Sequence, residues 1–240
     1  MKRKRHYRSW IPKDGLVPFQ AKVKETDLYI LAKMHLEMEA REAIIRFRQQ
    51  IEAYIKKNSF FKESLVPLPF DPWAPDIIRE MLAASQKIGV GPMAGVAGAI
   101  AEFVGKALLA FTPEVVVENG GDIFLQTHNE RKIGIFADRS PLNMRVGIKI
   151  PPGRTPLGIC TSSGTVGHSK SFGMADAVCV ISPSATLADA AATFLGNMVH
   201  GQQDIEWVLT EGRKISEIKG IVIIFNDTLG AWGDFELVRL

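Results

Sequence analysis

Hydrophobic positions along the chain follow two different periods, and each period predicts its own kind of element. Residues 19–23 and 28–31 are largely apolar segments on either side of the polar residues 24–27, a pattern that predicts a β-hairpin. From residue 34 to residue 57 the apolar residues instead recur every three or four positions, which predicts one long amphipathic helix.

Prolines and glycines mark where the next helices begin and end. The Pro-rich stretch 67–75 predicts a connector, with Pro75 placed to open a helix and Gly89 placed to close it. A Gly/Ala-rich helix should follow. Residues 93–111 are nearly free of charge but contain Glu102 and Lys106, so a helix packed tightly against a sheet is favoured over a membrane span.

Short apolar segments predict a series of strands after this helix. They comprise residues 114–117, 123–126, 132–136, 145–150, 177–181 and 221–225, with 128–131 as a hairpin turn and 235–240 pairing at a sheet edge. A helix over 184–199 should start at Ser184 as its N-cap. Strands that come as hairpins favour an α+β fold, a mixed β-sheet packed with helices, over a doubly wound parallel sheet.

Charge and cysteine content narrow the class of protein. Hydrophobic residues make up 46% and charged residues 23%, and much of the net charge of +3 lies in the opening basic run. We therefore expect a basic flexible tail over 1–8, a single domain over 9–240, and no nucleic-acid or membrane partner. Cys160 and Cys179 lack metal-ligand spacing, and no secretory signal follows the basic start, so a reduced, cytoplasmic protein is expected.

Two glycine-rich segments could hold a ligand or could be structural. Residues 89–98 lead into a helix and could present backbone amides to an anion, although their spacing is neither a dinucleotide fingerprint nor a P-loop. Close packing of two elements is the favoured alternative. After a hydrophobic strand comes a second segment that fits either a ligand loop or a plain hairpin turn, formed by Asn119, Gly120, Gly121 and Asp122.

A third segment, residues 160–173, combines hydroxyls, glycines, one histidine and one lysine. Such a composition offers many hydrogen-bond donors to a phosphate or carboxylate. The candidate binding residues are Thr161, Ser162, Ser163, Gly164, Thr165 and Lys170. His168 is the candidate acid or base.

The fourth segment places a carboxylate and a hydroxyl on one helix face. Asp189 and Thr193 are four residues apart among small apolar neighbours, so both side chains should share a face. Hard oxygen ligands of this kind suit Mg²⁺, which also binds substrate phosphates. A buried aspartate that caps a loop is the alternative, and both interpretations stay open.

Taken in order, these segments resemble motifs of the ApbE superfamily of FMN transferases. The matching stretches are 98–102 (Gly-Ala-Ile-Ala-Glu), 117–123 (Val-Glu-Asn-Gly-Gly-Asp-Ile), 161–164 (Thr-Ser-Ser-Gly) and 187–193 (Leu-Ala-Asp-Ala-Ala-Ala-Thr). A closer resemblance, spanning nearly the whole chain, is to an uncharacterised family related to these transferases. It also takes in residues 24–27, 89–94, 118–122 and 161–169.

The resemblance implies an ApbE-like fold and a concrete chemistry. Such transferases cleave FAD with Mg²⁺ and attach the FMN to a threonine of a target protein. By this resemblance Asp189 and Thr193 match the metal positions, and Asp122 matches the loop beside the flavin nucleotide. His168 is near the place of the histidine that opens the signature His-x-x-Asp-Pro-x-Thr-Gly.

Several residues depart from the transferase pattern. Glu102 replaces a lysine, Val96 an aspartate and Glu118 an asparagine, and no Asp-Pro-x-Thr-Gly follows His168. Because phosphoryl transfer depends on positioned charge, we expect a protein that binds a small phosphorylated or carboxylated ligand with Mg²⁺. The alternatives are an FAD-dependent FMN transferase, which would bind FAD or FMN, and a non-catalytic assembly protein. A homodimer is compatible with all three.

Overall fold

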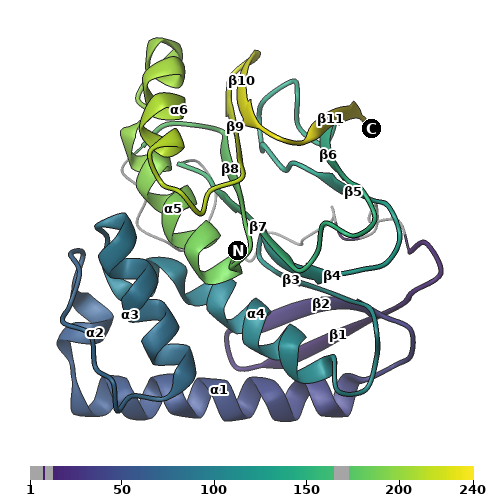
Figure 1. Cartoon of the computed structure of the whole chain (residues 1–240), viewed down its shortest axis with the longest axis vertical. Helices are drawn as coiled ribbons and strands as arrows, with labels where there is room; N and C mark the ends of the chain where they lie inside the picture. Colours follow the sequence, from purple (N-terminus) through teal and green to yellow (C-terminus); the bar gives the residue numbers. More distant parts are fainter. Residues whose placement is uncertain (1–7, 9–12, 165–172) are drawn as a thin grey trace.

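An eight-stranded antiparallel sheet forms the centre of the structure, in the order β1-β2-β3-β4-β7-β8-β9-β10 (Figure 1). This computed structural model describes residue 8 and residues 13–164 and 173–240. The strands are β1 Val17–Val23, β2 Thr26–Ala32, β3 Val115–Asn119, β4 Asp122–Gln126, β7 Leu157–Ser162, β8 Ala177–Ser182, β9 Gly220–Phe225 and β10 Thr228–Gly233.

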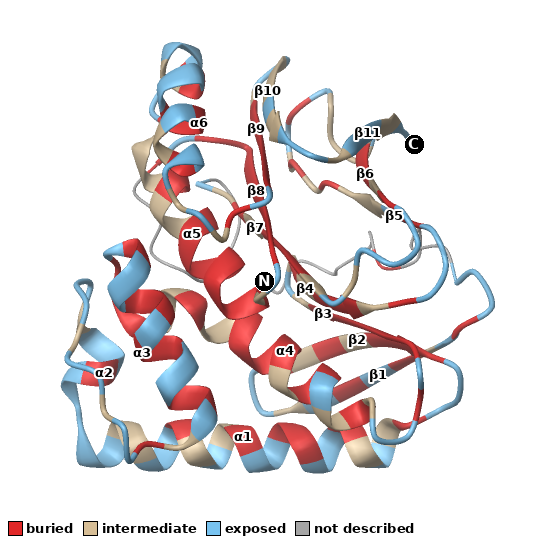
Figure 2. Ribbon diagram, in the orientation of Figure 1, coloured by how far each residue is buried: buried red, intermediate tan, exposed pale blue. Residues whose placement is uncertain are grey.

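Helices cover one face of this sheet. α4 and α5 lie directly on the strands, α1 and α3 pack against these helices from outside, and α6 lies over β9 and β10 (Figure 1). Figure 2 shows α1 buried along the side that faces the core and exposed along the other. The helices are α1 Glu37–Lys57, α2 Phe60–Glu63, α3 Asp76–Ile88, η2 Pro92–Gly95, α4 Val96–Leu108, α5 Ala185–Met198, η3 Gln202–Asp204 and α6 Ile205–Arg213.

A three-stranded antiparallel sheet covers the opposite face (Figure 1). Its strands are β5 Arg131–Gly134, β6 Val146–Ile150 and β11 Glu236–Arg239. The strands β3, β8 and β9 of the large sheet are therefore buried on both faces. Val117 faces the helices while its neighbour Val116 packs with Ile148 of the small sheet, because successive side chains of a strand point to opposite faces. Burial on both sides explains the continuous apolar runs in the sequence.

Several predicted elements are confirmed. The first hairpin turns at Lys24, which adopts φ 52, and Glu25. α3 begins after Pro75 and ends at Gly89 with φ 87, and the Ser184 side chain accepts a hydrogen bond from the Leu187 amide at the start of α5. The α+β class with hairpin strands is confirmed. All pairings between described strands are antiparallel, so the parallel component of the expected mixed sheet does not occur among them.

Other expectations need correction. The first long helix starts at Glu37 rather than at residue 34. The strand expected to form a hairpin with β4 instead leaves the large sheet: β5 pairs with β6, and β4 pairs with β7. The strands β7 and β10 and the helix α6 were not predicted. β7 ends in Cys160, Thr161 and Ser162, residues whose polarity suggested a loop.

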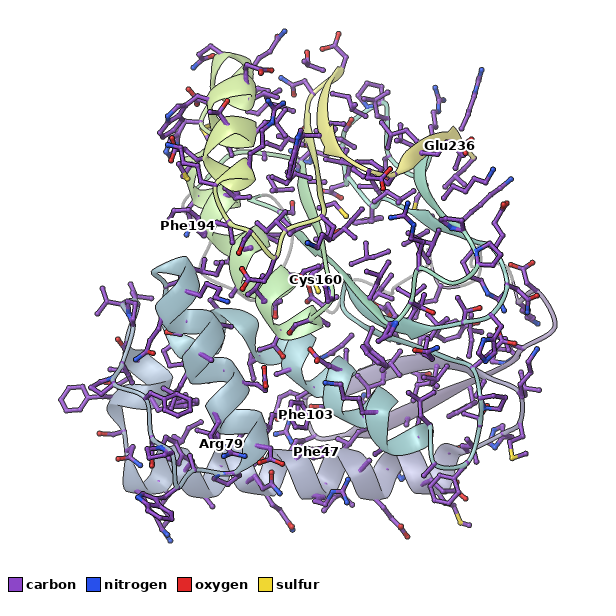
Figure 3. The ribbon with its side chains drawn as sticks, in the orientation of Figure 1. Phe47, Arg79, Phe103, Cys160, Phe194 and Glu236 are labelled. Atoms are coloured by element: carbon purple, nitrogen blue, oxygen red, sulfur yellow. The ribbon has the colours of Figure 1, made fainter. Side chains whose placement is uncertain are left out.

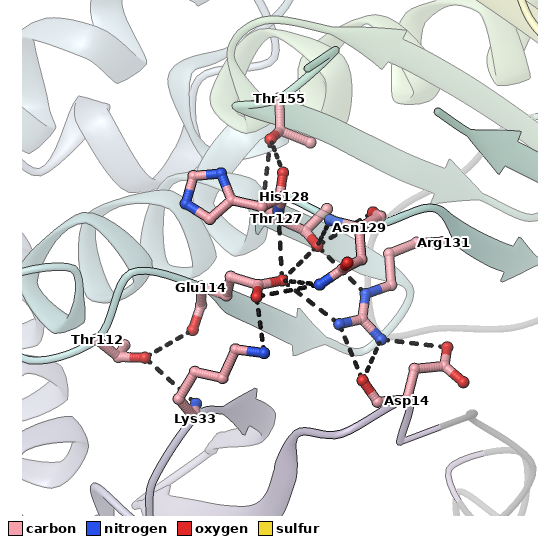
Figure 4. A network of polar contacts seen from close by, with 9 residues as sticks. All are labelled: Asp14, Lys33, Thr112, Glu114, Thr127, His128, Asn129, Arg131 and Thr155. Atoms are coloured by element: carbon pink, nitrogen blue, oxygen red, sulfur yellow. Dashed lines mark hydrogen bonds and ion pairs between the residues drawn. The ribbon is translucent and has the colours of Figure 1, made fainter. Parts of the chain in front are cut away.

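A buried polar network lies where the chain passes from β4 to β5 (Figure 4). The Glu114 carboxylate accepts from the Thr127 hydroxyl at 2.7 Å, lies 2.8 Å from the Lys33 ammonium and 3.5 Å from the Arg131 guanidinium. Burial raises the pKa of Glu114, but hydrogen bonds from Lys33, Thr127 and the His128 amide outweigh it and lower the pKa to about 2. The network holds Arg131 at the start of β5, the strand that pairs with β6 in the small sheet.

Candidate functional site

The described parts of all four predicted segments meet at one end of the large sheet, beneath the crossing of α4 and α5. Asp122 of β4 is the register partner of Cys160 in β7, and the Thr161 amide donates to the Gly121 carbonyl at 3.2 Å. α5 lies on β7, and the Cys160 thiol of β7 donates to the Ala185 carbonyl of α5 at 3.3 Å (Figure 3). The glycine turn, the end of β7 and the aspartate helix are thus neighbours in space.

Glycines let α4 and α5 approach closely at this point. A Cβ atom at Gly98 would lie 2.2 Å from the Ala185 carbonyl oxygen and 2.8 Å from the Asp189 Cβ. At Gly95 it would lie 2.7 Å from the Thr186 carbonyl oxygen. The close-packing interpretation of residues 89–98 is therefore confirmed, while an anion-binding role stays a prediction.

Asp189 is buried in α5, and its Oδ2 accepts a hydrogen bond of 2.8 Å from the Gly98 amide. Gly98 belongs to the first turn of α4, where amides lack partners within the helix, so Asp189 caps α4. Burial raises the pKa of Asp189 to about 7, although the amides of Gly98 and Ala97 lower it. Thr193 follows one turn later and is half-buried.

Asp122 is a second buried carboxylate in the same place. Burial, and then the negative charges of Asp189 and Glu118, raise the pKa of Asp122 well above its ordinary value. The same surroundings raise the pKa of the Cys160 thiol, chiefly through burial and then through Asp122 and Asp189. Burial is the largest cause of each of these pKa shifts, and neighbouring carboxylates add to it at Asp122 and Cys160.

The oxygen donors of these residues fit metal binding, and Asp189 and Thr193 as metal ligands stay a prediction. Asp189, Asp122 and Thr193 supply oxygen donors, the kind that Mg²⁺ prefers, with water or ligand oxygens completing its shell. Within residues 8, 13–164 and 173–240, no group of three or more His, Cys, Asp or Glu side chains could hold a metal ion. Any Mg²⁺ here would therefore be held by these few protein oxygens together with oxygens of water and of the bound small molecule.

The glycine turn is a hairpin turn with structural contacts. Asn119 and Asp122 are register partners, and Gly120 and Gly121 between them adopt φ 72 and φ 111, values that favour glycine. The Asn119 side-chain amide donates to the Ala97 carbonyl at 3.0 Å. The hairpin interpretation of this segment is thus confirmed, and its ligand role stays a prediction.

Glu118 and Arg8 form a contact that the sequence analysis missed. One oxygen of the buried Glu118 carboxylate accepts from the Gly121 amide at 2.9 Å, and the other accepts from Arg8 Nε at 2.7 Å. Arg8 was assigned to a flexible tail, but its exposed fraction is 9% because Glu118 and Asp27 bind it. The other residues of the tail lie outside the described part of the chain.

Glu102, which replaces the lysine of the transferase pattern, holds the two helices together. Its exposed fraction is 2%, and its Oε2 accepts from the Ser184 hydroxyl, the Thr186 amide and the Thr186 hydroxyl at 3.0–3.1 Å. Lys106 lies 2.7 Å from its other oxygen. The charge of Glu102 is therefore used at the start of α5. The sequence did indicate the ion pair with Lys106, because residues four positions apart share one face of a helix.

The end of β7 leads into a segment that the structure does not describe. Ser162 is buried, Ser163 is half-buried, and the Gly164 amide donates to the Ala175 carbonyl at 3.0 Å. The candidates Thr165, His168 and Lys170 lie outside the described residues. Gly173 packs against the Gly196 carbonyl of α5, where a Cβ atom would be 1.7 Å away. Gly164 therefore contacts Ala175, and Gly173 lies beside Gly196 in the turn of α5 that follows Thr193.

Two surface cavities lie away from these residues. One, of about 400 Å³, is lined by α1 residues and Pro75, and the other, of about 430 Å³, lies among β6, β10 and β11. Among the described helices, none is by itself long and apolar enough to span a membrane. α3 together with Pro92–Leu108 passes that test of length and composition, with a bend of 112°.

The fold is that of solved flavin transferases. The apo form of the Pseudomonas stutzeri flavinyl transferase ApbE matches with a TM-score of 0.59 and 14% identity, covering 90% of this chain and 93% of that chain. The apbe protein of Thermotoga maritima matches with a TM-score of 0.57 and 12% identity, covering 90% and 96%. At these identities the likeness defines the fold, which confirms the ApbE-like α+β class.

The chain belongs to the family described as AbpE bacteria, whose model matches residues 8–217. The UPF0280 protein MJ1526 of Methanocaldococcus jannaschii is 41% identical over 206 residues, covering 83% of this chain and 84% of that protein. The UPF0280 protein of Methanospirillum hungatei is 42% identical over 222 residues, covering 90% and 88%. The family resemblance predicted from the motifs is confirmed.

Proposed function

We propose that this protein binds Mg²⁺ together with a small phosphorylated or carboxylated ligand beside the glycine turn, the end of β7 and α5. One observation carries the proposal: the buried Asp122 lies on the strand paired with β7, and the buried Asp189 lies on α5, the helix that packs on β7. Among the described residues, no basic side chain forms an ion pair with either one. A divalent cation would offset the repulsion between the two carboxylates, which is otherwise costly in a buried site.

The surrounding residues have distinct roles in this proposal. Asp189 and Thr193 hold the metal, and Asp122 supplies a further carboxylate beside it. Ser162 and Ser163 offer hydroxyls to the anionic group of the ligand. Because Mg²⁺ keeps several waters and readily accepts phosphate oxygens, an anionic ligand would bind next to the metal rather than to the acidic side chains. His168 is the acid–base candidate.

Thermal unfolding of the metal-stripped protein tests this function. FAD, FMN, ATP and inorganic pyrophosphate are each added with and without Mg²⁺, since binding to the folded state raises the melting temperature. We expect at least one of them to raise the melting temperature in a Mg²⁺-dependent way, and the rise to vanish in Asp189→Asn. Asp227→Asn, a change at an exposed carboxylate, is the matched control. A rise that persists in Asp189→Asn, or none with any of the four compounds, argues against the proposal.

FMN transfer is a second candidate function. It is supported by the fold shared with proteins named as flavin transferases and by the match of Asp189 and Thr193 to the metal positions of that superfamily. The test is transfer of FMN from FAD to a target domain that carries an acceptor threonine. We expect transfer to require Mg²⁺ and Asp189. Binding of FAD with no transfer to the target domain would leave the binding proposal and remove this one.

Assembly through an exposed apolar surface is the third candidate. The connector between α1 and α3 carries five large apolar side chains with exposed fractions of 46–93%: Phe60, Leu65, Val66, Phe70 and Trp73. Patches of this kind commonly mark protein interfaces. The Gly/Ala-rich face of α4, by contrast, is covered by α5 and is not available for the expected homodimer. If two copies pair through the connector, Trp73→Ser should convert a dimer to a monomer in sedimentation velocity. A wild-type monomer, or a dimer unchanged by Trp73→Ser, would exclude this pairing.

A further inference from the structure

The helix α1 has an exposed face along its whole length. It runs along the outside of the molecule, and its buried residues lie on the side that faces the core (Figure 1, Figure 2). Because each residue of a helix turns by about 100°, Gln49 lies in the middle of the opposite side. The residues of this exposed face are Met38, Glu42, Ile45, Gln49, Ala53 and Lys56.

Two opposite charges on this face lack a partner within the described part of the chain. Among the described residues, neither Glu42 nor Lys56 forms an ion pair. Each has an opposite charge one helical turn away, but that charge is engaged elsewhere. The Arg46 guanidinium lies 4.5 Å from the centre of the Phe47 ring, and Glu52 pairs with two other basic side chains. One acidic and one basic group are thus left at opposite ends of the face.

The surface cavity of about 400 Å³ opens beside the same face. Its lining includes Gln49 and Ala53 of α1 and Pro75 before α3. Since Ala53 contributes only a methyl group, an apolar side chain from outside could enter there. Ile45 is an exposed apolar residue on the same face, with an exposed fraction of 41%. It lies eight positions before Ala53, about 12 Å along the helix, and so does not fill the cavity of its own chain.

A second copy of α1, laid antiparallel across Gln49, matches these features to one another. In such a pair, residues equally far before and after Gln49 face each other across a twofold axis, and every contact occurs twice. Glu42 then faces the partner's Lys56, since each is seven positions from the axis. Ile45 faces the partner's Ala53, four positions from the axis, and can enter the cavity there. The face is therefore complementary to itself in both charge and shape.

We propose that a second copy of this chain binds this face of α1, antiparallel and with the twofold axis at Gln49. The inference does not depend on the ligand site, and it assigns the second copy to a surface other than the connector. A helix of 21 residues is only about 30 Å long. The pair should therefore bury less than a standard interface of about 1,600 Å², and we expect a reversible dimer with a dissociation constant in the micromolar range.

Exchange of the two charges separates this role from that of a solvated helix face. Glu42→Lys places like charges together at both ends of the interface, so the dissociation constant should rise at least about tenfold in sedimentation velocity. Lys56→Glu should have the same effect. The double variant Glu42→Lys with Lys56→Glu restores opposite charges in exchanged positions. It should return the dissociation constant to within about threefold of the wild type.

Glu206→Lys is the matched control for this exchange. It makes the same change of charge at an exposed carboxylate of α6, a helix at the other end of the molecule from α1 (Figure 1), and should leave the dimer unchanged. A wild type that is monomeric at every concentration overturns the proposal, as does a dimer that Glu42→Lys leaves intact. A dimer lost in Trp73→Ser but not in Glu42→Lys also overturns it and favours pairing through the connector.

Disulfide cross-linking tests the position of the axis. Gln49→Cys should join two copies under mild oxidation, because residue 49 meets its own copy, and the native Cys160 and Cys179 are buried. Arg41→Cys is the control on the same helix, since Arg41 is also exposed. Its two copies would be about 24 Å apart along the helices, too far for a disulfide. Equal cross-linking of the two variants, or none in Gln49→Cys, overturns the proposed arrangement.

Discussion

The Asp189 carboxylate of α5 accepts a 2.8 Å hydrogen bond from the Gly98 amide in the first turn of α4, although the two residues are 91 positions apart. This contact joins the most specific predicted motif to the Gly/Ala-rich helix. It also explains the small residues around it, because a side chain at position 98 would collide with both Ala185 and Asp189.

Gly98→Ala should therefore destabilise the protein by about 2 kcal/mol or more, since the added methyl group would lie 2.2 Å from a backbone oxygen. Chemical denaturation measures the change. Gly196→Ala in α5 is the matched control, because its nearest new contact would be 3.5 Å away and alanine favours helices. Equal stability of the two variants would contradict the close packing of α4 and α5.

Asp189 should make the metal-free protein less stable as the pH rises. Its pKa is about 7 in the folded protein and 3.8 ordinarily, so the folded state holds a proton that the unfolded state has lost. The stabilising effect is complete below about pH 4 and disappears as the pH rises through about 7. In Asp189→Asn the loss of unfolding free energy over this pH range should be smaller by on the order of 2 kcal/mol. Urea midpoints between pH 4 and pH 8 measure it, and an equally steep decline in the variant would refute the assignment.

Glu114 should have the opposite pH dependence. Its pKa falls from 4.5 to about 2 in the folded protein, so its stabilising effect is present above pH 4.5 and is lost as the pH falls towards 2. Glu114→Gln should cost roughly 2 kcal/mol at neutral pH, because it removes the carboxylate that pairs with Lys33 and one of the two carboxylates that contact Arg131. The difference between variant and wild type should shrink in acid. A difference that does not depend on pH would argue against the ion pairs in Figure 4.

Restoring the lysine of the transferase pattern should not restore a transferase site. Glu102→Lys would remove the acceptor for Ser184 and Thr186 and place a cation at the start of α5, where the helix dipole disfavours it. We expect a loss of about 3 kcal/mol. Lys106→Met, which removes the half-exposed partner, should cost less than about 1 kcal/mol. A stable Glu102→Lys protein would contradict the capping role of Glu102.

Local signals in the sequence predicted the elements whose ends depend on neighbouring residues. Pro75, Gly89 and Ser184 each act through their own backbone or one nearby amide, which is why α3 and α5 were bounded correctly. β5 was placed wrongly because it pairs with β6, which follows it, and not with β4, which precedes it. Composition could not reveal which sheet that strand joins.

In the candidate site, too, the local motifs were predicted and the contacts between distant residues were missed. The motifs predicted that Asp122 and Asp189 share a location, and the strand order brings them together through Cys160. Arg8 was missed because its partner Glu118 is 110 residues away and a basic run by itself is typical of a solvated tail. The contacts of Asn119 with Ala97 and of Glu102 with Ser184 and Thr186 were missed because these partners are distant in the sequence. Both sets of contacts depend on how α4 packs.

Calorimetric titration of Mg²⁺ into the metal-stripped protein, compared with Asp189→Asn and Asp122→Asn, is the most direct test of the proposed site. Asparagine keeps the shape and a hydrogen-bond acceptor for the Gly98 amide, so both variants should fold. We expect one Mg²⁺ site in the wild type, lost in Asp189→Asn, weakened at least tenfold in Asp122→Asn, and intact in Asp227→Asn. No Mg²⁺ binding in the wild type, or equal binding in Asp189→Asn, would contradict a metal site at these carboxylates.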